Sequence, residues 1–127
     1  MRKSHLQLHT EPVAKARARV TRRGFAYTPK KSKDSEKAII YLIRQQFNES
    51  VYDVAIKVII HFGIKKPKSV KRIHPSCRPD VDNFAKQIID SGNKLLWEDD
   101  SLICDLRVIK KYSEEPFIEV FIEELVD

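Results

Sequence analysis

The stretch Val-Tyr-Asp-Val-Ala-Ile-Lys-Val-Ile-Ile-His-Phe, residues 51–62, carries the strongest secondary-structure signal in the chain. Every second position is apolar, at Val54, Ile56, Val58, Ile60 and Phe62. The polar residues Asp53, Lys57 and His61 occupy alternate positions, on the other face. Because successive side chains of a strand point to opposite faces, this pattern predicts a strand with one buried face. Such an apolar strand is expected at the centre of a sheet.

Two helices are predicted around this strand. In residues 32–47, apolar side chains recur at helical spacing, and Ser32 or Asp34 is the expected N-cap. This stripe consists of Ile39, Ile40, Ile43 and Phe47. The second helix is expected from Asp80 to Gly92, since glycine is a natural C-terminal stop. Its buried stripe consists of Val81, Phe84, Ala85 and Ile88.

Shorter extended segments complete the predicted fold. They are residues 4–10, 17–21, 25–28, 102–110 and 117–125. Only a short link separates the last two, so they are expected to form an antiparallel hairpin. The element order predicts an α+β fold in one small domain spanning residues 1–127, with a mixed or mostly antiparallel sheet packed with two main helices.

Composition limits the classes of function. The 127 residues carry a net charge of +6. They contain no apolar run long enough to span a bilayer, and no signal peptide is recognised. A cytoplasmic location is therefore expected. The two cysteines, Cys77 and Cys104, are too few for a disulfide framework and lack the spacing of zinc ligands. Both are expected to be buried or half-buried. Two segments, residues 11–33 and 65–78, hold 14 of the 24 cationic side chains, which is typical of a phosphate-binding surface.

Residues 78–86, Arg-Pro-Asp-Val-Asp-Asn-Phe-Ala-Lys, place acid directly after the second basic segment. Asp80 and Asp82 stand at the start of the second predicted helix, and Asp99 and Asp100 follow Trp97 further on. Carboxylates repel phosphate, so a polyanion-binding face normally lacks them. A divalent metal removes that conflict, because Mg²⁺ binds carboxylates together with substrate phosphate. The pattern therefore indicates a metal-dependent phosphodiester site, with Lys86 able to stabilise developing negative charge.

Each acid also has a simpler interpretation. Asp80 can be the N-cap of the helix, and Asp82 a first-turn acid that complements the helix dipole. Asp82, Lys86 and Asp90 fall four residues apart, as in a surface salt-bridge ladder, and for Asp90 this is the preferred interpretation. Taken alone, the acidic pattern leaves both interpretations open.

The chain resembles the RusA family of Holliday junction resolvases over nearly its whole length. The family's Arg-x-Asp-x-Asp-Asn-x-x-Lys run is met by Arg78, Asp80, Asp82, Asn83 and Lys86, with later acids at Asp90 and Asp99-Asp100. Residues 12–19 and 22–31 are similar to the family's basic entry segment. Where relatives tend to continue the helix with Asp-Ala-Leu, this chain has Asp-Ser-Gly-Asn at residues 90–93, so the helix is expected to end earlier.

This resemblance implies the roles of the site residues. Asp80, Asp82 and Asp100, the last in preference to Asp99, would be catalytic metal ligands for Mg²⁺ or Mn²⁺, and Lys86 an essential cation near the scissile phosphate. The resemblance also implies a homodimer that nicks two opposed strands of a four-way junction. The number of metal ions is left open.

The predicted function is a Mg²⁺-dependent endonuclease that resolves four-way DNA junctions in recombination and repair. The expected DNA-backbone contacts are Lys15, Arg17, Arg19, Arg22, Arg23, Lys65, Lys66, Lys68, Lys71, Arg72 and Arg78. Two alternatives are a basic nucleic-acid-binding module without catalysis, and a metal-dependent nuclease that acts on flaps or other branched DNA.

Overall fold

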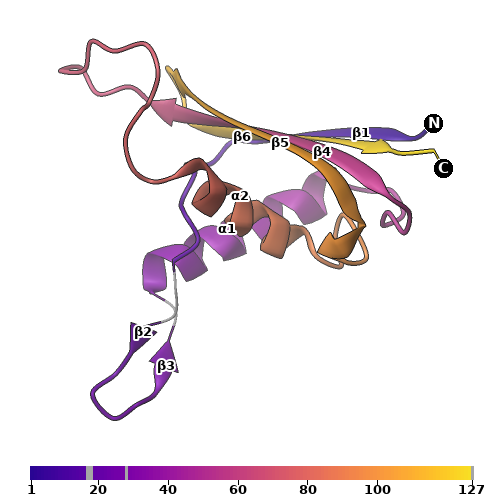
Figure 1. Ribbon diagram of the computed structural model, residues 1–127, viewed down its shortest axis with the longest axis horizontal. Helices are drawn as coiled ribbons and strands as arrows, with labels where there is room; N and C mark the ends of the chain where they lie inside the picture. The colour runs from indigo at the N-terminus through magenta and orange to yellow at the C-terminus, as the bar shows by residue number, and fades with distance from the viewer. Residues whose placement is uncertain (17–18, 28, 127) are drawn as a thin grey trace.

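One four-stranded sheet organises the protein. The computed structural model describes residues 1–16, 19–27 and 29–126. The sheet has the order β1-β6-β4-β5, made of β1 (Lys3–Leu8), β6 (Phe117–Glu124), β4 (Ile56–Lys65) and β5 (Ile103–Ser113). Two helices, α1 (Lys30–Gln46) and α2 (Val81–Gly92), cover one face of the sheet (Figure 1). Since β4 pairs parallel with β5 and antiparallel with β6, the sheet is mixed, and the predicted α+β fold is confirmed.

β4 lies between two other strands, as its apolar pattern predicted. Its core-facing residues, Ile56, Val58, Ile60 and Phe62, are at most 1% exposed. The predicted start of this strand was wrong, because β4 begins at Ile56 and Val54 is 39% exposed. Tyr52 is buried instead, and its backbone bonds to Leu96 and Glu98, so the chain there is held by residues that follow α2.

The two helices agree with their predicted stripes. Ile39 and Ile43 of α1 and Phe84 and Ile88 of α2 are buried against the sheet. The predicted caps of α1 were wrong, since the N-cap position is Pro29. Ser32 is instead buried within the helix, where its hydroxyl accepts a hydrogen bond from the amide of Ala16 at 3.3 Å.

The predicted hairpin of the last two strands was wrong. β5 and β6 do not pair with each other; each pairs with β4, on opposite sides. Strands lie about 4.8 Å apart, so crossing one intervening strand needs roughly 10 Å, which the link at residues 114–116 can span. β6 begins directly after the link with Phe117, which lies opposite Gly63 of β4, and an added Cβ at Gly63 would overlap the ring of Phe117. A short link therefore does not imply pairing here.

Two basic segments project from this body. The first is a hairpin of β2 (Arg19–Val20) and β3 (Ala26–Tyr27), and the second is the loop of residues 66–80 between β4 and α2. Figure 1 shows both extending to the left of the view, one below and one above. Residues 17, 18 and 28 of the two predicted N-terminal strands lie outside the described residues.

Two smaller expectations differ from the structure. The first strand ends at Leu8, before the predicted Thr10. Cys77 and Cys104 are both exposed free thiols, so their predicted burial was wrong. Within the described residues, neither helix has the length and apolar character that crossing a bilayer requires.

Candidate active site

Asp80 occupies the N-cap position of α2 without capping it. Its carboxylate accepts no hydrogen bond from the helix; the amides of Asn83 and Phe84 bond to the Asp80 backbone carbonyl, at 3.1 and 3.3 Å. A capping aspartate would accept such a bond through its side chain. The capping interpretation of Asp80 is therefore wrong, and its exposed carboxylate is available for another role.

Asp82 and Lys86 follow on the exposed side of α2, one turn apart. The predicted ladder of Asp82, Lys86 and Asp90 is wrong, because Asp90 pairs with Lys15 from the N-terminal segment, at 3.8 Å. Lys15 Nζ also lies 3.7 Å from Glu36 of α1, so this cation joins both helices. Among the ion pairs of the described residues, none involves Asp82 or Lys86.

A hollow of about 520 Å³ lies beside the exposed side of α2. Its polar lining residues are Asp82, Lys86, Asp90 and Asp100. The rest of its wall is apolar and comes from α2 and β5, namely Val81, Ala85, Ile89, Leu106 and Val108. The structure therefore brings together three of the four predicted catalytic residues, while Asp80 stands at the preceding N-cap and outside the lining of this hollow.

The return of the chain after α2 delivers Asp100 to this hollow. α2 ends at Gly92, as the departure from the family pattern predicted. The ring of Trp97 packs directly on Gly92, where an added Cβ would lie 2.7 Å from the ring, and Trp97 is 0% exposed. Its indole donates to Asn93 Oδ1 at 3.1 Å, which closes the turn. The short helix η1 (Asp100–Leu102) begins three residues later.

The neighbouring acids Asp99 and Asp100 have different surroundings. Asp99 is the N-cap of η1, and its carboxylate accepts a hydrogen bond from the Ser101 amide at 3.0 Å. This bonding with Ser101 lowers the pKa of Asp99 below its usual value. Asp99 is thus engaged in local structure, whereas Asp100 lines the hollow together with Asp82.

The donor set of the hollow is suited to a hard cation. Carboxylate oxygens are the ligands that Mg²⁺ prefers, and protein sites often supply only one or two of them, with substrate phosphate completing the shell. Across residues 1–16, 19–27 and 29–126, no group of three or more His, Cys, Asp or Glu side chains is close enough to hold a metal by itself. Asp82 and Asp100 both line the hollow, so this surface offers two carboxylates of the kind that a hard cation binds.

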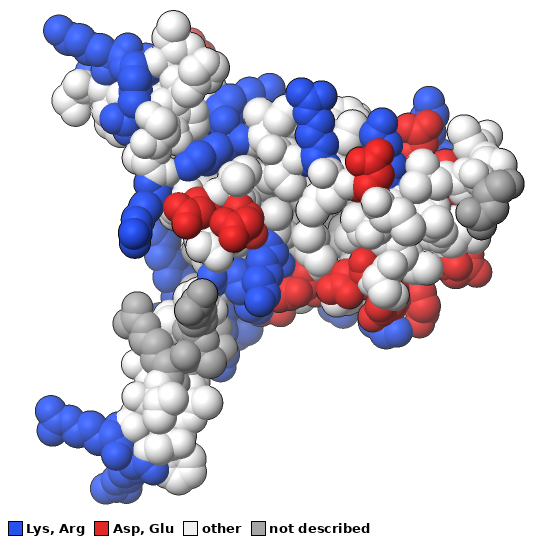
Figure 2. All heavy atoms as spheres, in the orientation of Figure 1, with Lys and Arg blue, Asp and Glu red and all other residues white. Residues whose placement is uncertain are grey.

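Basic side chains stand on either side of this acidic region. Figure 2 shows Lys and Arg gathered on both projecting segments, with Asp and Glu between them over the start of α2. In the lower segment, Arg22 and Arg23 are exposed in the turn of the hairpin. Arg17 lies outside the described residues, and so does the side chain of Arg19.

The upper projection carries the remaining predicted contacts. Lys65, Lys66, Lys68, Lys71, Arg72 and Arg78 are all exposed. Lys66 and Arg72 lie over the ring of Tyr112 in β5, with their charged groups 5.7 and 5.9 Å from its centroid. Tyr112 thus anchors the base of the loop on the sheet, a role that no sequence pattern indicated.

Lys110 is a second residue that the sequence did not single out. From β5, its ammonium donates to the carbonyls of Cys77 and Pro79, at 2.5 and 3.0 Å. These carbonyls belong to the turn that leads into Asp80, so Lys110 fixes the entry to α2. The only signal in the sequence was a lysine in an otherwise half-apolar strand, which does not reveal a partner more than 30 residues away.

Comparisons with known proteins agree with this arrangement. The model of the family described as "Endodeoxyribonuclease RusA" matches residues 9–123. A protein of Bacillus subtilis (strain 168) carrying the name "Uncharacterized protein YqaN" is 33% identical over 133 aligned residues, which cover 93% of this chain and 94% of the relative. The matched region contains the hollow, both projecting segments, β4, β5 and all but the last residue of β6, whereas β1 precedes it.

Proposed function

This chain belongs to the RusA endodeoxyribonuclease family, and on that basis we propose that it is a Mg²⁺-dependent nuclease that resolves four-way DNA junctions. One observation carries the proposal: Asp82, Asp100 and Lys86 line the same hollow. The start of α2, beside this hollow, lies between two basic projections (Figure 2). Hydrolysis of a phosphodiester needs carboxylates for a metal ion and positive charge near the phosphoryl oxygens. Both requirements are met on one surface of this domain.

In this proposal Asp82 and Asp100 would hold the metal ion from α2 and η1. Asp80 is the third proposed ligand, and because it stands at the N-cap outside the hollow, its carboxylate would have to move toward the other two to join them. When bound, Mg²⁺, or Mn²⁺ in its place, supplies positive charge to the scissile phosphate and favours ionisation of a water molecule. Lys86 contributes a cation on the same wall, where it stabilises charge that develops on the phosphoryl oxygens. Asp99 keeps its structural role in η1.

The basic projections would bind the sugar-phosphate backbone on either side of the scissile bond. Arg22 and Arg23 act from the hairpin, and the loop cations with Arg78 act from above. Arg17 and Arg19 belong to the same proposed set. Lys15 is a weaker candidate for DNA contact, because two carboxylates already share its charge.

Resolution of a junction requires two opposed strands to be cut, and each chain offers one such hollow. We therefore propose a homodimer, whose two-fold symmetry matches that of a four-way junction. Sedimentation of the purified protein with junction DNA tests this point. A complex that contains only one chain per junction would contradict the homodimer.

Cleavage assays on three labelled DNAs test the function. The protein is incubated with a four-way junction, a flap and a linear duplex, each with Mg²⁺ and with EDTA. We expect paired cuts in the junction, with Mg²⁺ only. Cuts mainly in the flap would indicate the alternative nuclease. Salt-sensitive binding without cleavage in any metal would indicate a basic binding module.

Substitution of both hairpin arginines should weaken DNA binding through the backbone alone. We expect Arg22→Ala with Arg23→Ala to lower affinity for junction and duplex by similar factors, and to reduce the slope of log affinity against log salt by about 2. Fluorescence anisotropy over a salt series measures this slope. The matched control is Lys37→Ala with Arg44→Ala, which removes two exposed cations from α1 and should leave the slope unchanged. Equal slopes for both double variants would contradict the assignment.

Loss of Lys110 should impair cleavage more than binding. We expect Lys110→Met to lower the single-turnover rate by about tenfold or more, because two charge-assisted hydrogen bonds that hold the entry to α2 disappear. Lys111→Met makes the same change at the next position of β5, where the side chain lies near the ring of Phe117 instead, and should cleave normally. Equal rates for the two variants would exclude this positioning role.

A further inference from the structure

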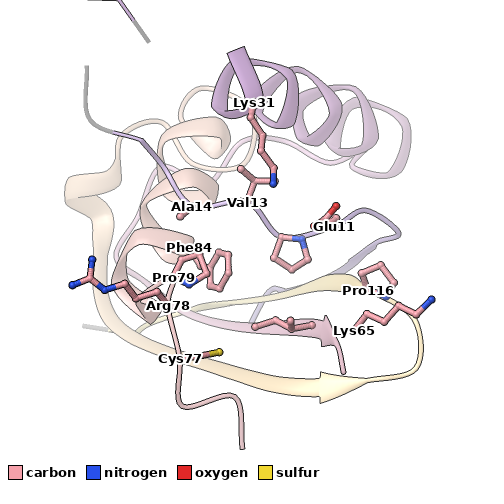
Figure 3. Close-up of a pocket in the computed structure, with 12 residues that line it drawn as sticks. Glu11, Val13, Ala14, Lys31, Lys65, Cys77, Arg78, Pro79, Phe84 and Pro116 are labelled. Carbon is pink, nitrogen blue, oxygen red and sulfur yellow. The ribbon is translucent and has the colours of Figure 1, made fainter. Parts of the chain in front are cut away.

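A second cavity, of about 530 Å³, opens next to the proposed active site. It lies between the N-terminal segment, the end of β4, the turn that leads into α2 and the β5–β6 link (Figure 3). Its inner wall is apolar, made of Pro12, Val13, Ala14, Ile64, Pro79, Phe84 and Pro116. The polar lining residues are Glu11, Lys31, Lys65, Cys77 and Arg78.

Contacts between distant segments hold the wall of this cavity in place. Phe84 is 3% exposed, and its ring stacks on that of Phe62 in β4, with 5.2 Å between centroids. Lys15 donates its amide to the Asn83 carbonyl at 2.9 Å, which ties the N-terminal segment to the first turn of α2. Lys110 holds the turn at Pro79 from the other side. A preformed apolar space with few polar groups is typical of a ligand site.

Cations surround the opening. Figure 3 shows Lys31 reaching from α1 toward Val13, while Arg78 and Lys65 extend outward on opposite sides. Of the residues that line the cavity, Glu11 is the only acid, against three cations. An apolar interior with cations outside fits a flat, uncharged ring system that carries phosphate on both flanks. A nucleotide within a DNA strand has this chemistry.

We propose that this cavity receives one unstacked nucleobase of the bound DNA. The base lies in the apolar space, and Arg78 and Lys65 contact the phosphates that precede and follow it. This inference rests on the proposed function. Arg78 is two residues from Asp80, so a DNA strand that leaves the cavity passes the proposed metal ligands. Extruding a base costs stacking energy, and the cost is smallest where pairing is already absent, as at a branch point.

Two matched DNAs test this proposal without cleavage. Each is a duplex with one unpaired residue, either adenosine or an abasic analogue that keeps the same phosphates. Affinities are measured in EDTA, so the metal site takes no part. We expect about tenfold tighter binding of the unpaired adenosine, because a single base contact of this kind contributes roughly a factor of ten or more. Equal affinities would overturn the proposal.

The two free thiols report where the base binds. Cys77 lines the cavity and Cys104 is exposed elsewhere, on β5, so one protein contains both probe and control. Each DNA is added until about nine-tenths of the protein is bound. In the adenosine complex, alkylation of Cys77 by a maleimide should be roughly tenfold slower than in the abasic complex. Alkylation of Cys104 should be equally fast in both complexes. Equal protection of Cys77 by the two DNAs would locate the base outside the cavity and overturn the proposal.

A cavity-filling variant completes the test. Cys77→Trp places a large side chain at an exposed position of the lining, and Cys104→Trp is the matched control outside it. Only Cys77→Trp should abolish the preference for adenosine over the abasic analogue, with duplex affinity unchanged in both variants. Retention of the preference in Cys77→Trp would overturn the proposal. None of these measurements needs a metal ion. Base binding can therefore be confirmed even if the cleavage assay fails, and it can be refuted even if cleavage is observed.

Discussion

Asp82→Asn should abolish cleavage of a four-way junction while leaving DNA binding intact or stronger. The amide keeps the size of the side chain but removes the negative charge that would hold the metal ion. Metal-ion stabilisation of a transition state amounts to several kcal/mol, so we expect the rate to fall by about a thousandfold or more. Affinity should not fall, because one carboxylate that repels phosphate is gone from the DNA-facing surface.

The substitution should leave the fold unchanged, because Asp82 is exposed and no ion pair of the described residues involves it. Single-turnover cleavage in Mg²⁺ gives the rate, and anisotropy in EDTA gives the affinity. Asp53→Asn is the matched control, since Asp53 is an exposed acid in the segment before β4 and lines none of the described hollows. If Asp82→Asn cleaved at the normal rate, its role as metal ligand would be wrong.

Trp97→Ala should destabilise the protein strongly. Trp97 is fully buried and packs on Gly92, so its removal leaves a cavity that neighbouring backbone cannot fill. We expect the free energy of unfolding to fall by about 3–5 kcal/mol. The same contact determines where the chain returns toward η1, so cleavage should also fall, even at temperatures where the variant is folded.

Urea denaturation followed by circular dichroism measures the loss. Tyr41→Ala is the control, because Tyr41 is an aromatic residue that is 61% exposed on α1, and its removal should change stability by less than about 0.5 kcal/mol. A Trp97→Ala protein that matched this control in stability would show that the packing against Gly92 is dispensable. A folded variant with normal cleavage would show that Asp100 reaches the hollow without it.

The elements that could be predicted are those whose signal is local. The alternation from Ile56 to Phe62 and the helical stripe of α2 each lie within one segment, so the sequence reveals them directly. Asp82 and Lys86 lie one helical turn apart for the same reason. Strand pairing is not local: β5 and β6 are joined by three residues, yet both bond to β4, which comes much earlier in the chain.

The rest of the site depends on contacts between distant segments. Asp90 looked like a partner of Lys86 because helical spacing favours that pair, but Lys15 arrives from the N-terminal segment and takes its place. Lys110 and Tyr112 hold the basic loop from β5, and neither has a motif. The family resemblance indicated the identity of the acids, while the placement of Asp82 and Asp100 on one hollow, with Asp80 outside it, required the three-dimensional structure.

The pairing of β1 with β6 has a consequence for how the protein is made. Lys3 lies opposite Glu123 and Leu8 opposite Ile118, so an edge strand from the start of the chain bonds to the last strand of the sheet. Ribosomes add about 5–20 residues per second, so β1 waits on the order of ten seconds for its partner. During that time Leu6 and Leu8 have no sheet to join. The sheet therefore completes only after β6 has left the ribosome, although β1 is made first.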